Sequence, residues 1–178
     1  MRKQTLPLAQ VYRLLEPGPV VLLTTAHKGR ANVMAMSWHT MLEFEPPQVG
    51  CVVSNRNHSF VALRTTKECV LAIPTAELAP KVVQCGNATG RRIDKFAAFG
   101  LTPVQATLVG PPLVAECYAN LECKVVDTRM VNAYNFFVLE VVHAWIAPGR
   151  TTARTIHHRG RGVFMIAGAT LKLPSRMK

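Results

Sequence analysis

Residues 32–42 read NVMAMSWHTML and mix the valine and methionines of a buried strand with several hydrogen-bonding side chains. The apolar residues favour a β-strand that packs into a core. Asn32, Ser37, Trp38 and His39 place polar atoms among them. A buried polar group without a partner costs about 1–3 kcal/mol. These atoms therefore need partners, either in neighbouring strands or on a bound ligand.

The segments next to this stretch predict an antiparallel hairpin followed by more strands. VVLLTT at 20–25 is typical of a strand, and AHKGR at 26–30 supplies a turn that contains glycine. The strand returns over 31–42, and QVGCVVS at 48–54 predicts the next one. Ser59 is expected to cap a helix over 60–67, because its hydroxyl can accept N–H groups of the first turn. Further strands are expected at 69–73, 113–128, 135–147 and 162–173.

The middle of the chain has helical spacing instead. Apolar residues recur at Leu78, Val82 and Val83 and again at Ile93 and Phe96, which predicts two helices. Gly100 is the expected end of the second helix, and a short helix is also expected over 8–15. Six or more antiparallel strands with a helical insert predict a mainly β, α+β fold built on a small closed barrel.

The composition limits the classes of protein to which the chain can belong. The 178 residues suit one domain, and 49% apolar against 17% charged residues indicate a globular chain. The net charge of +11 is spread along the chain, which argues against a nucleic-acid partner and favours a basic surface in contact with solvent; it also fits an anionic cofactor. No apolar run is long enough to cross a membrane. Five cysteines without CxxC spacing favour free thiols in the cytoplasm.

The sequence contains no common catalytic motif, but it has four polar clusters. There is no GxSxG, Walker loop, HExxH or GxGxxG after a strand. Hydroxyls, basic side chains and helix N-termini hold phosphate, and aromatic faces with a few amides hold a planar heterocycle. The clusters are Asn32/Ser37/Trp38, SNRNHS at 54–59, GRRIDK at 90–95 and AYNFF at 133–137. Each cluster alone is more often a turn, a core residue or a solvated loop.

The order of these clusters resembles the flavin reductase-like family, and within it the flavoredoxin-type branch. The match runs through NVMAMSWHTMLEFEPPQVGCVVSNRNHSF, CVLAIP, VQCGNATGRRIDKFAAFGLTP and YNFFVLEVVHAW, and covers about residues 18–170. The resemblance implies a six-stranded antiparallel Greek-key split barrel with a helical insert. It also implies a homodimer that binds FMN near the subunit interface.

The resemblance also assigns cofactor-binding residues. Asn32, Ser37 and Trp38 would lie against the flavin. Ser54, Arg56, Ser59 and Lys95 would serve the phosphate end or the ring edge. Tyr134 or Asn135 stands where flavoredoxins often carry histidine, which departs from the family pattern. Phe164 would close the pocket, on this subunit's flavin or on the partner's.

Three functions remain open from the sequence. The first is an FMN-dependent oxidoreductase that takes hydride from NADH or NADPH and passes electrons to free flavin, iron or a protein. The second is an electron-transfer flavoprotein without nicotinamide activity of its own. The third is a non-catalytic barrel that binds another planar ligand. A flavin carries its own redox chemistry, so all three agree with the lack of an acid–base dyad.

Overall fold

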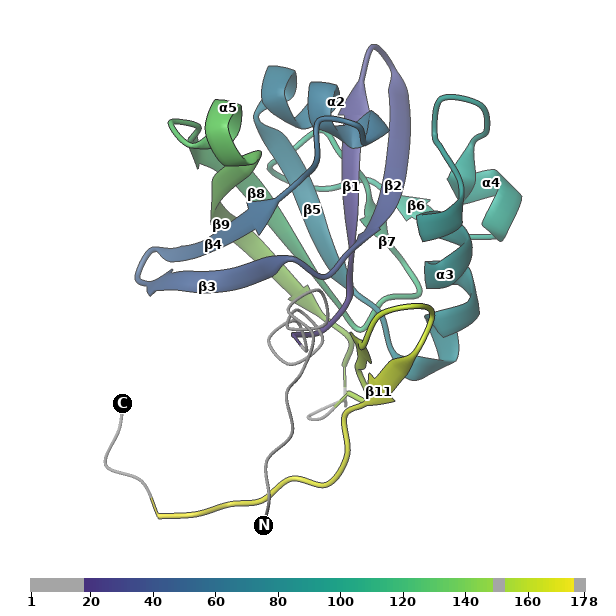
Figure 1. Ribbon diagram of the computed structural model, residues 1–178, viewed down its shortest axis with the longest axis vertical. Coiled ribbons are helices and arrows are strands. Elements are labelled where there is room, and N and C mark those ends of the chain that lie inside the picture. The colour runs from purple at the N-terminus through teal and green to yellow at the C-terminus, as the bar shows by residue number, and fades with distance from the viewer. Residues whose placement is uncertain (1–17, 149–152, 175–178) are drawn as a thin grey trace, which may run out of the picture.

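The computed structural model describes residues 18–148 and 153–174 and is built around one antiparallel sheet (Figure 1). The sheet has seven strands in the order β2-β1-β5-β8-β9-β4-β3. The strands are β1 (Val21–His27), β2 (Arg30–Met36), β3 (His39–Phe44), β4 (Pro47–Val52), β5 (Glu68–Ile73), β8 (Ala119–Asp127) and β9 (Phe136–Ile146). The helix expected over 8–15 lies outside the described residues.

The sheet closes on itself between β2 and β3. These strands lie at opposite ends of the strand order, yet only Ser37 and Trp38 separate them along the chain. The Trp38 carbonyl accepts a hydrogen bond of 3.0 Å from the Val52 amide. The sheet is therefore a split barrel, and it has six strands when β2 and β3 count as one bent strand. The prediction of one unbroken strand over 31–42 is wrong at Ser37–Trp38, where the strand changes sheet partner.

Strand β1 is buried on both faces, which explains its unbroken apolar run. Val21 and Leu23 point into the barrel core. Val20 and Leu22 pack on the other face in a second cluster that includes Val82. Successive side chains of a strand point to opposite faces, so this strand separates two cores. The second core places the helical insert against the sheet.

Helices cover one side and one end of the barrel. They are α2 (His58–Thr66), the 3-10 turn η2 (Ala76–Leu78), α3 (Ala79–Asn87), α4 (Lys95–Phe99) and α5 (Val131–Tyr134). Helices α3 and α4 lie beside β2, and α2 lies at the end of the barrel near the β1–β2 hairpin (Figure 1). The predicted insert is confirmed, and so is its end: Gly100 adopts φ 61° and caps α4.

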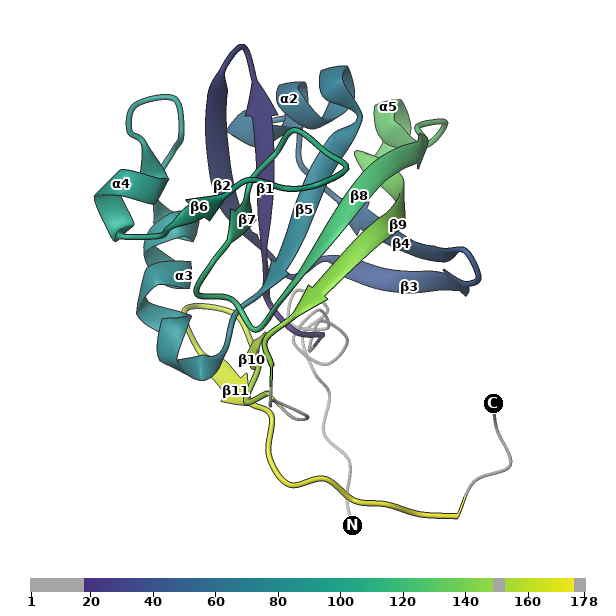
Figure 2. The same cartoon turned by 180° about the vertical axis from the view of Figure 1, so that it is seen from behind.

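Three local predictions need correction. Helix α2 begins at His58, so Asn57 is its N-cap residue and Ser59 is already inside the helix. The strand expected over 113–128 is interrupted and forms β7 (Leu113–Val114) and β8. The strand expected over 162–173 shrinks to β11 (Phe164–Ile166), which pairs with β10 (Ile156–His158). Strand β7 pairs with β6 (Pro103–Val104) in a segment that crosses the outside of the sheet (Figure 2).

No helix in the described part of the chain is long and apolar enough to span a membrane. All five cysteines are buried free thiols. Burial raises the pKa of Cys51 to about 12, with the Cys123 thiol as a smaller cause. Within residues 18–148 and 153–174, no three His, Cys, Asp or Glu side chains form a group that could hold a metal ion. The five cysteines are thus residues of the core.

Candidate functional site

A groove made of two adjoining cavities runs along β2 on the side of α3. One cavity has a volume of about 230 Å³ and the other about 270 Å³, and both are lined by Ala35 and Gly86. Strand β2 pairs only with β1 in the described sheet, so the backbone N–H and C=O groups on its other edge are not paired with a further strand of that sheet. This edge forms one wall of the groove, and α3 with the loop after it forms the other.

The smaller cavity is polar and contains four of the predicted residues. Asn32, Arg56, Ser59 and Lys95 all line it. They come from β2, the loop before α2, α2 itself and the start of α4. Asn32 and Ser59 are buried, and the Asn32 amide donates a 2.8 Å hydrogen bond to the Ser59 hydroxyl. Ser59 therefore contacts β2 from inside the helix and does not act as its cap.

Lys95 is a buried cation at the bottom of this cavity. Its side chain is only 4% exposed, and its ammonium group donates a 2.7 Å hydrogen bond to the Cys85 carbonyl. The two ion pairs found in the described ranges join Arg129 to Asp127 and Arg154 to Glu77, so neither neutralises Lys95. Burial lowers the pKa of Lys95, and the Cys85 thiol opposes this weakly. An anion in the cavity would stabilise the charged form.

Among the lining residues of this cavity that were not predicted are His58 and Gly90. Burial, followed by the charges of Arg91, Arg30 and Lys95, lowers the pKa of His58. A Cβ atom at Gly90 would lie 2.0 Å from Oδ1 of Asn32, so only glycine allows this approach. The GRRIDK cluster marked the right loop, but the need for glycine depends on a contact with a distant strand.

The larger cavity is mostly apolar and lies at the other end of the groove. Its lining includes Val20, Met36, Val82 and Val83. Ser37 and Phe164, two more of the predicted residues, also line it. Phe164 thus faces a cavity of its own chain, beside the ring of His158 at a centroid distance of 5.3 Å. The groove as a whole changes from apolar to basic along β2.

The remaining predicted residues do not line either cavity of the groove. Trp38 is 57% exposed and Tyr134 is 66% exposed. The Ser54 hydroxyl accepts a 3.3 Å hydrogen bond from the Arg56 amide, so it shapes the loop before α2. The Asn135 carbonyl accepts a 3.1 Å hydrogen bond from the Val53 amide. Within one chain, these four residues therefore lie outside the groove.

Some of the polar side chains of residues 32–42 have hydrogen-bond partners within the protein. Asn32 bonds to Ser59, and Nε2 of His39 lies 2.7 Å from the Pro19 carbonyl oxygen. Trp38 meets solvent. At Asn32 and His39 the predicted need for hydrogen-bond partners is therefore met by the protein itself, without a ligand. The edge of β2 that lines the groove is the part of the stretch that a ligand can pair with.

The fold and the groove define a class of protein: a split barrel whose cavity suits a ligand with an apolar planar part and an anionic end. Residues 13–164 match the family model described as the flavin reductase like domain, and the chain belongs to this family. The family comprises flavin-related oxidoreductases and electron-transfer proteins.

Individual relatives agree with the family assignment. YddH of Escherichia coli is 32% identical over 170 residues, which is 88% of this chain and 90% of that protein. A Pyrococcus abyssi protein is 33% identical over 131 residues, which is 74% of this chain and 75% of its own length.

Solved structures share the fold over nearly the whole chain. An FMN-binding domain of a flavin reductases-like enzyme from Shewanella baltica has a TM-score of 0.82 at 25% identity and covers 96% of this chain and 97% of its own. Flavoredoxin from Methanosarcina acetivorans has a TM-score of 0.86 at 22% identity, covering 99% and 97%. The expected split barrel and family are therefore confirmed.

Proposed function

We propose that the chain is an FMN-dependent oxidoreductase of the flavin reductase type, with NADH or NADPH as its electron donor. The observation that carries the proposal is the buried Lys95, which has no carboxylate partner in the described part of the chain and lies at the basic end of a groove whose other end is apolar. Such a gradient suits a planar ring joined to a phosphate. The family membership supports the flavin as that ligand.

The residues of the groove fit FMN. Lys95 and Arg56 offer positive charge to the phosphate, and Ser59 lies in the first turn of α2, where helix N–H groups favour an anion. The apolar lining at Val82, Val83 and Phe164 excludes water from a ring. Backbone groups along β2 can bond to the ring edge.

When bound, the flavin supplies the redox chemistry, accepting hydride from a nicotinamide and passing electrons to free flavin, iron or a protein. The protein's part is to bind, orient and shield this group. Within the described part of the chain, the groove lining contains no Asp or Glu that could act as a proton carrier. The cytoplasm, where thiols are kept reduced, fits the five free cysteines.

The proposed function predicts a yellow protein that bleaches with a nicotinamide. We expect protein loaded with FMN to lose its visible flavin absorbance under anaerobic conditions after addition of NADH or NADPH. Free FMN at the same concentration is the control for the uncatalysed reaction. If bound FMN is reduced by dithionite but by neither nicotinamide, the hydride-transfer part is rejected and the electron-transfer function is favoured.

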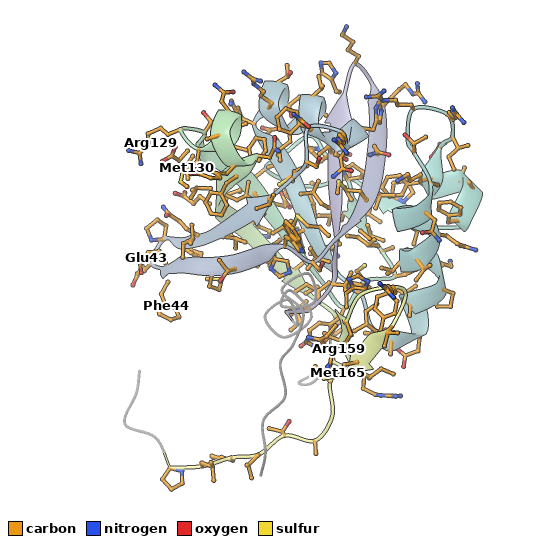
Figure 3. All side chains as sticks on the ribbon, viewed as in Figure 1. Glu43, Phe44, Arg129, Met130, Arg159 and Met165 are labelled. Carbon is orange, nitrogen blue, oxygen red and sulfur yellow. The ribbon has the colours of Figure 1, made fainter. Side chains whose placement is uncertain are left out.

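We further propose that the active form is a homodimer. The large apolar side chains Trp38, Met41, Leu42 and Phe44 are exposed on and before β3. Phe44 points away from the sheet at the tip of β3 (Figure 3). A partner on this side would cover apolar surface and bring residues near the apolar end of the groove, where Ser37 lies.

The dimer predicts a solution mass twice that of the 19.6 kDa chain. We expect light scattering at micromolar concentration to give the dimer mass for the wild type. Phe44→Asp should shift the protein towards the monomer, because it places a charge in the proposed interface. Val126→Asp, which replaces an exposed apolar residue of β8, is the matched control. A wild-type protein of monomer mass contradicts this proposal.

A further inference from the structure

A third cavity, of about 460 Å³, lies between the β1–β2 hairpin and helix α2. Its sheet wall consists of two directly opposed pairs, Thr25 with Asn32 and His27 with Arg30. Opposed residues of an antiparallel pair project from the same face of the sheet. All four side chains therefore belong to one surface at the open end of the barrel, beside α2 (Figure 1).

Within the described ranges, the lining of this cavity contains basic residues and no acidic one. Its basic residues are His27, Lys28, Arg30, His58 and Arg91. None of these takes part in the two ion pairs that the described ranges contain. Burial lowers the pKa of His58, and the charges of Arg91 and Arg30 in this lining, with that of Lys95, lower it further. The side chains of Val61 and Ala62 add an apolar wall on α2. The cavity therefore combines an anion site with a surface on which a flat group can pack.

The Thr25 hydroxyl gives an independent sign of a missing partner. Thr25 is 1% exposed, and its Oγ1 atom has no hydrogen-bond partner among residues 18–148 and 153–174. Thr25 also lines the cavity. Buried hydroxyls are normally hydrogen-bonded, and an unpaired one costs about 1–3 kcal/mol. An acceptor or donor on a ligand in the cavity would remove this cost.

The position of the cavity limits which ligand it takes. It shares Asn32, Asn57 and His58 with the cavity that contains Lys95. It shares no lining residue with the apolar cavity at the other end of β2. It thus continues the groove beyond the phosphate end, away from the place proposed for the ring. A group in it would be attached to, or lie next to, the flavin phosphate.

We propose that this cavity binds the nucleoside-phosphate half of a flavin dinucleotide, the adenylate of FAD, whose flavin half lies along β2. The inference rests on the proposed function, keeps its FMN site along β2, and extends it to FAD as a second flavin that the same groove accepts. Arg30 and Arg91 hold the second phosphate, Thr25 bonds to a polar atom of the nucleoside, and Val61 packs against the flat base. FMN leaves this cavity to solvent, so FAD gains contacts that FMN lacks.

The test measures the affinities of FAD and FMN for the apoprotein by fluorescence titration at one ionic strength. We expect Arg30→Ala to weaken FAD about tenfold through loss of a charge-assisted bond, with a much smaller effect on FMN. Arg92→Ala is the matched control, because Arg92 is an exposed neighbour of Arg91 and does not line any of the three cavities. It should leave the FAD-to-FMN affinity ratio unchanged.

A second variant separates binding from folding. Thr25→Val keeps the side-chain shape and removes the unpaired hydroxyl, so we expect a higher melting temperature of the apoprotein and a lower FAD-to-FMN affinity ratio. A structural role for the hydroxyl would instead lower the melting temperature and leave the ratio unchanged.

The outcomes also separate this inference from the proposed function. FMN binding with a FAD-to-FMN ratio that neither Arg30→Ala nor Thr25→Val changes overturns the FAD site alone. Failure to bind either flavin overturns the proposed function. AMP and NADP+ are also titrated against the FMN-loaded protein. If either binds in an Arg30-dependent manner while the FAD-to-FMN ratio stays constant, the cavity belongs to a separate nucleotide and the FAD assignment is wrong.

Discussion

Lys95→Met is expected to weaken FMN binding by about 1.5–3 kcal/mol, or roughly tenfold to more than a hundredfold, because it removes a charged hydrogen-bond donor from the phosphate. Riboflavin has no phosphate, so its affinity should change little. The folded apoprotein should tolerate the change, since methionine replaces a buried charge that lacks a carboxylate partner among the residues that the structure describes. Fluorescence titration of both flavins measures the FMN-to-riboflavin ratio, and Lys172→Met at an exposed position is the control.

The same lysine predicts a pH dependence. Burial lowers the pKa of Lys95, so its charge is lost at a lower pH than that of an ordinary lysine. The ratio of FMN affinity to riboflavin affinity, measured at each pH, should therefore fall as the pH rises through this lowered pKa. The fall should be absent in Lys95→Met. If the FMN-to-riboflavin affinity ratio of the wild type stays constant as the pH rises into the alkaline range, Lys95 does not bind the phosphate.

Glu122→Leu is expected to lower the free energy of unfolding by about 3 kcal/mol or more, because several buried donors lose their acceptor. Glu122 is fully buried and accepts hydrogen bonds from the Trp145 indole at 2.8 Å and from the amides of Thr107 and Leu108 at 3.0 and 2.6 Å. It therefore fixes the segment that crosses the outside of the sheet (Figure 2). Urea unfolding followed by fluorescence measures the loss.

The contribution of Glu122 should depend on pH with a defined sign. Burial acts to raise the pKa of this carboxyl, but the hydrogen bonds from Trp145, Thr107 and Leu108, helped by the charge of His143, outweigh burial and lower it. A group whose pKa is lowered by folding stabilises the protein above its unfolded pKa and loses this effect as the pH falls through its folded value. The stability difference between wild type and Glu122→Leu should therefore shrink in acid.

Glu140→Gln on β9 is the control for this variant. It changes one partly exposed carboxyl of the same sheet and should alter stability by less than about 0.5 kcal/mol. If Glu122→Leu is as stable as Glu140→Gln at neutral pH, the bonds to the crossing segment do not stabilise the fold.

The barrel was predictable because its strands and helices have clear local patterns. Residues 20–25 and 48–54 contain the apolar runs of buried strands, and Gly100 ends the insert in the left-handed conformation that favours glycine. The break at Ser37–Trp38 was not predictable in this way, because both halves read as strand. The position of the break depends on how the sheet closes, because β2 pairs with β1 and β3 pairs with β4.

The predicted site residues that lie together are mostly those whose residue type alone suits an anion. Arg56, Ser59 and Lys95 meet around one cavity, as the resemblance implied. The assigned cap role of Ser59 was wrong, because the helix starts two residues earlier, at His58, and the Ser59 hydroxyl accepts a hydrogen bond from Asn32. Gly90 was missed because the need for glycine at this position comes from its close approach to Asn32, which is far away in the sequence. Their roles in flavin binding remain predictions.

The measurement that tests the central claim most directly is the titration of wild-type apoprotein with FMN and with riboflavin at one ionic strength. The groove with Lys95 at its basic end predicts one FMN per chain and an affinity for FMN at least tenfold higher than for riboflavin. Equal affinities would contradict the phosphate site at Lys95, and binding of neither compound would contradict the flavin groove along β2.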